Sequence, residues 1–131
     1  MNKVIAEITT EQNSVVHGDH HIITTVELKD GVGPFDAGTL LFKGASGYEP
    51  LAKSDVTNTA TAVAYDNLEA KASSAVLNVV VHGAVRGEKL LYADGSLASE
   101  DVRDDLRDVG IYAIGQMAES AGTSAGTSAG A

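Results

Sequence analysis

Short apolar runs, many of them rich in β-branched residues, recur along most of this chain and predict strands. Gly, Pro, Asn and Asp separate them. The predicted strands are residues 22–28, 38–43, 48–51, 62–65, 75–82 and 111–114. The almost continuous apolar run 75–82 indicates a central strand covered on both faces. Residues 38–43 and 48–51 form a hairpin across the four-residue connection 44–47.

A single helix is predicted near the end of this β-rich region. Val102, Leu106 and Val109 recur at four and then three residues, which gives one apolar stripe on a charged surface. Ser99 is the expected N-cap, because its hydroxyl can accept a hydrogen bond from a first-turn amide. Gly110 lies where a left-handed residue would end the helix. We therefore expect about three helical turns packed on one face.

The first 23 residues are predicted to form an extended arm. In a strand, Val4, Ala6 and Ile8 would share one face and Ile5 would lie on the other. The polar run 9–14 has no apolar face at either period. Such a segment cannot build a core alone, so we expect it to pair with another chain.

The C-terminal segment has a different composition. Residues 118–131 contain a repeated Ser-Ala-Gly-Thr pattern without large side chains, which predicts a flexible tail. The predicted organisation is therefore an arm at 1–23, a β-rich domain at 24–117 and a low-complexity tail at 118–131.

Composition limits the possible functions of this 131-residue chain. Aromatic residues make up only 5 %, so Ala, Val and Leu must fill a core of modest size. The net charge of −9 disfavours direct binding to nucleic acid, and no disulfide can form because Cys is absent. No segment approaches the ~20 apolar residues that span a bilayer, so we expect no membrane partner.

The histidines are the main candidates for chemistry. His17, His20 and His21, with Asp19, could supply zinc or nickel ligands. However, adjacent strand residues point to opposite faces, so His20 and His21 would not ligate one ion together, and a polar turn is the preferred interpretation. His82 has no nucleophile or orienting acid that the sequence nominates.

Other catalytic and binding motifs are missing from the sequence. The segment 44–47 lacks the pattern of a nucleophile elbow, and neither a phosphate-binding loop nor a calcium loop is present. We therefore expect no enzymatic activity, no cofactor and no metal.

The order of several short motifs resembles the head decoration proteins of tailed phages, the lambda type. The resemblance covers residues 24–114. Its carriers are residues 37–41 (AGTLL), 47–51 (GYEPL), 63–64 (VA), 81–85 (VHGAV) and the helix that ends at 110–111 (GI). It implies a compact, small β-barrel-like domain of the β-tulip type with one short helix near the C-terminus, an extended N-terminal arm and a flexible tail. In that family, three copies form a trimer at local three-fold positions on the expanded head.

The resemblance also implies a function, which is to cement the outer capsid surface against internal DNA pressure. The expected partners are the major capsid protein and two further copies of the chain in a homotrimer, on virions made in the host cytoplasm. The arm would add a strand to the capsid protein, and its capsid-binding residues would be Val4, Ile5, Ala6 and Ile8.

Two other functions remain open at this stage. The chain could be a trimeric virion fibre or adhesin component that binds a host surface. It could also be a small trimeric β-barrel enzyme with His82 and Arg86 in a site between subunits.

Overall fold

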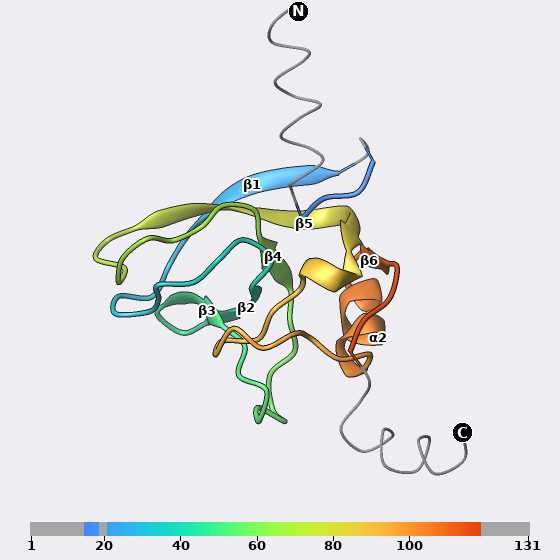
Figure 1. Ribbon diagram of the computed structural model, residues 1–131. Helices are drawn as coiled ribbons and strands as arrows, with labels where there is room; N and C mark the ends of the chain where they lie inside the picture. The colour runs from blue at the N-terminus through green and yellow to red at the C-terminus, as the bar shows by residue number, and fades with distance from the viewer. Residues whose placement is uncertain (1–14, 19–20, 119–131) are drawn as a thin grey trace, which may run out of the picture.

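The computed structural model describes residues 15–18 and 21–118 (Figure 1). This part of the chain is rich in strands and has one short α-helix near its C-terminal end, which confirms the predicted fold class. The elements are β1 (Ile22–Glu27), β2 (Leu40–Gly44), β3 (Gly47–Pro50), β4 (Ala62–Ala64), β5 (Val76–Arg86), the 3₁₀ turn η1 (Gly87–Lys89), α2 (Asp101–Asp108) and β6 (Ile111–Ile114). All of the predicted tail except Ala118 lies outside the described residues.

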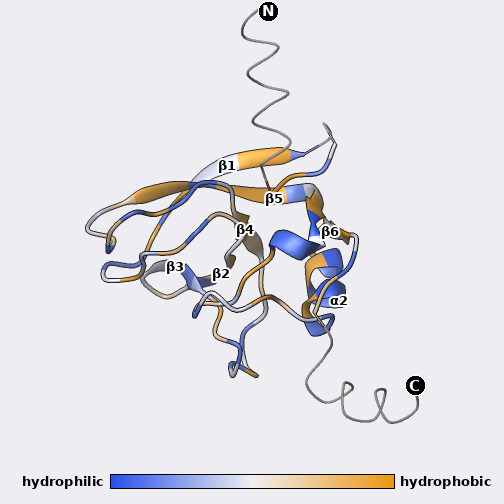
Figure 2. Ribbon diagram, viewed as in Figure 1, coloured by the Kyte–Doolittle hydropathy of each residue, from blue (hydrophilic) through white to orange (hydrophobic). Residues whose placement is uncertain are grey.

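The long strand β5 organises the sheet. The strand order is β1-β5-β4-β2-β3 with antiparallel neighbours, and β6 adds to β5 in parallel. At Val79 and Val80, β5 pairs with β1 on one side and β4 on the other. Figure 2 shows that β5 is apolar along much of its length, as a central strand requires.

The two ends of this strand order meet, so the sheet closes into a small barrel. Leu28, just after β1, forms a parallel bridge with Tyr48 of β3, and the Lys29 amide donates to the Tyr48 carbonyl at 2.9 Å. Gly47 permits this approach: a Cβ there would lie 2.8 Å from the Lys29 nitrogen. The barrel-like part of the predicted fold therefore depends on one glycine contact.

Strands β2 and β3 form the predicted hairpin, but with a tighter turn. Gly44 pairs directly with Gly47, so the connection consists of Ala45 and Ser46 rather than four residues. Both glycines extend the strands into the turn.

Both faces of the central strands are covered. On one face, Leu40, Val63 and Val80 join a core that includes α2 and β6 residues. On the other, Leu41, Ala64 and Val79 pack with Leu28, Phe35 and Leu77. The predicted double covering of the strand 75–82 holds at Val79 and Val80, whereas Val76, Asn78 and His82 are exposed.

The helix packs by a narrower stripe than predicted. Val102 and Leu106 are buried, whereas Val109 is 39 % exposed. Gly110 has a φ of 90° and ends the helix, as predicted. Val109 is the C-cap residue, so it has already left the helical face that continues Val102 and Leu106.

The prediction that Ser99 caps this helix is wrong. The helix begins at Asp101, and the N-cap residue Glu100 makes no capping hydrogen bond with its side chain. Ser99 is buried, and its hydroxyl lies 2.8 Å from the Tyr92 hydroxyl and donates to the Asp101 carboxylate at 3.0 Å. The buried Tyr92 hydroxyl thus competes with the backbone amides of the first helical turn for the Ser99 hydroxyl.

Candidate functional site

The predicted capsid-binding residues Val4, Ile5, Ala6 and Ile8 lie outside the described residues. The structure does describe the point at which the N-terminal segment joins the domain. We call Val15, Val16 and His17 the arm root, and it extends the β1 side of the sheet along the C-terminal half of β5 (Figure 1).

Backbone hydrogen bonds fix the arm root to β5. The Arg86 amide donates to the Val15 carbonyl at 2.7 Å, and the His17 amide donates to the Ala84 carbonyl at 3.0 Å. The Arg86 guanidinium adds a bond from Nε to the Val16 carbonyl at 3.1 Å. The first residues of the described chain are therefore held in a defined position.

Burial also fixes the arm root. Val15 and Val16 are each 2 % exposed and belong to the core cluster that contains Leu106 and Ile111. The boundary predicted between residues 23 and 24 therefore falls inside β1, and the packed domain extends back to Val15. The two adjacent valines after a polar run were the only local hint of this anchor, and they did not indicate its partner on β5.

An apolar surface lies beside the arm root, on the outer side of β5 and β6. In β6, Ile111 and Ala113 are buried, whereas Tyr112 and Ile114 are 45 % and 42 % exposed. Tyr112 pairs in register with Ala84 of β5, and Ile114 pairs with Arg86 of β5. We call Ile22, His82, Ala84, Tyr112 and Ile114 the outer face; Ile22, opposite His82 in the ladder, is 56 % exposed.

His82 is held within this outer face. Its ring packs edge-on against Tyr112, with 6.4 Å between centroids. Gly110 leaves room for it, since a Cβ there would lie 2.7 Å from His82 Nδ1. The contacts of the His82 ring are therefore with an aromatic ring and a glycine rather than with a nucleophile or a carboxylate.

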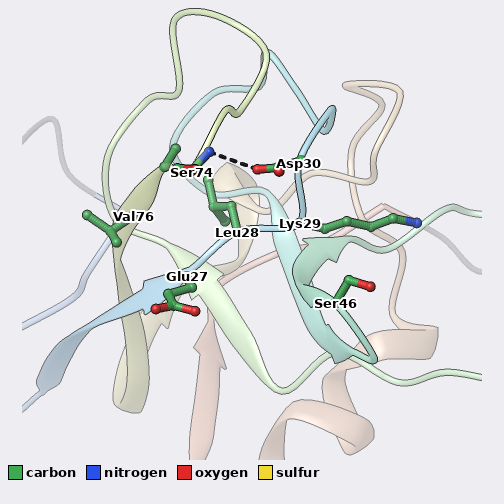
Figure 3. A pocket seen from close by; sticks show the side chains of 8 residues that line it. Glu27, Leu28, Lys29, Asp30, Ser46, Ser74 and Val76 are labelled. Atoms are coloured by element: carbon green, nitrogen blue, oxygen red, sulfur yellow. Dashed lines mark hydrogen bonds between the residues drawn. The ribbon is translucent and has the colours of Figure 1, made fainter.

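A separate groove of about 520 Å³ opens where β1 ends (Figure 3). Its floor is fixed by the Ser74 amide, which donates to the Asp30 carboxylate at 2.8 Å, and Ser74 has a positive φ of 54°. Lys29 points away toward Glu49, with 3.9 Å between Nζ and Oε1. The groove is open, and its lining mixes charged side chains of both signs with serines and apolar residues, an arrangement that specifies no particular ligand.

The histidine cluster considered for a metal is only partly visible. His17 and His21 are described, whereas His20 and Asp19 are not. Within residues 15–18 and 21–118, no group of three or more His, Cys, Asp or Glu side chains is placed to hold a metal ion. These residues give the metal interpretation no support.

One exposed loop is internally rigid. The Asp55 carboxylate accepts the Thr57 and Asn58 amides at 2.8 and 2.9 Å and the Asn58 side-chain amide at 3.0 Å. The Asn58 side chain, followed by these backbone amides, lowers the pKa of Asp55. Val56 in this loop is 96 % exposed.

Comparisons with family models, curated proteins and solved structures give no match to this chain. In the described part of the chain, no helix combines the length and apolar character needed to cross a membrane. The features of this chain that bear on function are therefore the arm root, the outer face and the sequence of the arm.

Proposed function

We propose that this chain is a capsid decoration protein. It binds the outer surface of the expanded phage head as trimers at local three-fold positions and stabilises the head against internal DNA pressure. The observation that carries the proposal is the arm root: the strand-like N-terminal sequence leads to an anchor that is buried in a small β-rich domain.

Strand addition accounts for the arm's composition. An added strand gains affinity from backbone hydrogen bonds and specificity from alternating side chains. Val4, Ala6 and Ile8 supply that alternation. Ile8 precedes Val15 by seven residues, so it reaches at most about 25 Å from the anchor when fully extended. The arm root is already held in place by β5, so its ordering adds no cost to binding.

The major capsid protein is the proposed partner, and the expanded lattice is the proposed state. A ligand that binds only one state of a shell stabilises that state by mass action. Three arms on one trimer would act together through effective concentration, so each contact can be modest. The net charge of −9 keeps such a protein away from the DNA phosphates.

State-selective binding tests this function. We expect the full chain to co-sediment with expanded, DNA-free heads of the phage that encodes it, and to bind unexpanded heads at least about tenfold more weakly. The measurement is the bound fraction across a concentration series. Equal binding to both head states would contradict the stabilising role, and no binding to either would favour the fibre or adhesin alternative.

A further inference from the structure

We propose that the free edge of β1 pairs with the same edge of a second copy of this chain, with the two strands antiparallel about Thr24. We call the side of β1 that faces away from β5, along residues 22–27, the free edge. The inference goes beyond the proposed function and does not rest on it, because it concerns the protein in the absence of any capsid.

The free edge carries backbone groups that have no partner. The Leu28 amide donates to the Ala75 carbonyl at 3.0 Å, which makes these two residues a hydrogen-bonded pair of the antiparallel ladder. Because such pairs alternate along a strand, the amide and carbonyl groups of Ile23 and Thr25 point away from β5. Within the described chain, neither another strand nor a loop backbone pairs with these groups.

The end of β1 supports this direction and limits the free edge. The Lys29 amide points the same way and donates to the Tyr48 carbonyl of β3 at 2.9 Å, so β3 covers the edge just beyond β1. Figure 1 shows β1 at the outside of the sheet, beside β5. The donors and acceptors left along residues 22–27 are those that an added extended strand would satisfy.

The side chains of β1 do not keep another strand away. Native sheets protect their edges with Lys, Pro or a bulge in the edge strand. The β1 sequence contains no Lys and no Pro, and its single charged residue, Glu27, is at its last position. The one irregularity of the β1–β5 ladder places the extra residue, Val81, on β5, so β1 itself stays regular.

A second β1 is complementary to the free edge. In an antiparallel pair about Thr24, Ile23 of each copy faces Thr25 of the other, so every free group of these two residues meets a free group. Ile22, which is 56 % exposed, then faces Val26 across the pair, a contact between β-branched side chains. The contact is two-fold symmetric, which is the commonest symmetry of protein pairs.

The test is Thr25→Pro in the full chain, with Thr25→Val as its matched control. The Thr25 amide points away from β5, so proline removes a donor of the free edge and leaves the β1–β5 hydrogen bonds in place. Both variants lose the hydrogen bond from the Thr25 hydroxyl to Asn78 Oδ1, so they differ at the free edge. Circular dichroism verifies the fold of each variant.

Self-association is measured by sedimentation of the free protein from about 5 to 500 µM, because one strand pair buries less than the ~1,200 Å² of stable interfaces. We expect the average mass of the unaltered chain and of Thr25→Val to rise toward twice its value at the lowest concentration. Thr25→Pro should associate about 10- to 100-fold more weakly. No rise for the unaltered chain, or equal association of the two variants, would overturn the inference.

A charge exchange tests the register and leaves every backbone group in place. Thr24 of one copy faces Thr24 of the other, so Thr24→Lys and Thr24→Glu should each associate more weakly than the unaltered chain. An equal mixture of the two variants should associate again, because opposite charges then face each other. A mixture that associates no better than its components would contradict the pairing about Thr24.

Hydrogen exchange shows what covers the free edge. In the unaltered full chain, we expect the Ile23 and Thr25 amides to exchange more slowly as the protein concentration rises. Slow exchange at every concentration would mean that the edge is covered within one chain, and the inference would be wrong. None of these measurements uses capsid heads, so their outcome is separate from that of the co-sedimentation test.

Discussion

Gly38→Ala is expected to lower the free energy of unfolding by about 4 kcal/mol, whereas Gly95→Ala lowers it by about 1 kcal/mol. Both glycines have positive φ, 99° and 87°, so an added side chain strains either backbone. Only at Gly38 does the new Cβ also collide: it would lie 2.0 Å from the Lys89 carbonyl oxygen, whereas nothing lies within 4 Å at Gly95.

The backbone at Gly38 cannot move aside easily. Its amide donates to the Ala64 carbonyl at 2.8 Å, and its carbonyl accepts the Leu91 amide at 2.9 Å. A shift that relieves the collision would break the bond from Gly38 to β4, the bond from the segment after η1 to Gly38, or both. Urea unfolding of both variants measures the difference. Equal losses would contradict the close approach that the structure shows.

Two N-terminal truncations are expected to differ sharply in stability. Removal of residues 1–14 should leave the free energy of unfolding within about 0.5 kcal/mol of the full chain, since the arm root stays in place. Removal of residues 1–16 should lower it by about 3–5 kcal/mol, because it deletes Val15 and Val16, each 2 % exposed, and uncovers Val85.

Chemical unfolding followed by far-ultraviolet circular dichroism tests this difference, with both truncated chains at the same concentration. The chain without residues 1–14 serves as the matched control for the two extra residues. Similar stability of the two truncated chains would mean that the arm root contributes little to the free energy of unfolding. The arm would then have no rigid anchor, which the proposed function requires.

Local patterns in the sequence were sufficient to predict most strands. The strand at 75–82 was predictable from its apolar run, and the hairpin from the glycines that bound its turn. Both features are local, because they depend on the side-chain period and on turn residues. Gly110 was likewise predictable as the helix end, since a left-handed residue is needed there.

Features set by distant contacts could not be predicted in this way. Val15 and Val16 follow a polar run and are buried only because β5 offers Ala84 and Arg86 as backbone partners, some seventy residues later. Ser99 is a residue type that often caps helices, yet its hydroxyl is hydrogen-bonded to the Tyr92 hydroxyl instead. The barrel closure depends in the same way on the contact between Leu28 and Tyr48, which no local sequence pattern predicts.

The outer face was only partly predictable from the sequence. The strand at 111–114 was predicted from the sequence, but its residues are all apolar, so which of its two faces stays open depends on where α2 packs. Arg103 of α2 donates to the Ala113 and Gly115 carbonyls, which holds the helix against one side of β6. Tyr112 and Ile114 are left on the other side. The arm residues themselves were predicted only from their alternation and from the family resemblance.

Co-sedimentation of the chain lacking residues 1–14 with expanded heads shows whether the arm is responsible for binding. This truncation keeps Val15, Val16 and the packed domain, so a loss of binding cannot be assigned to unfolding once its stability has been verified. We predict that it binds at least about 100-fold more weakly than the full chain, because the strand supplied by the arm is missing. Binding equal to that of the full chain would contradict the arm-mediated cement function.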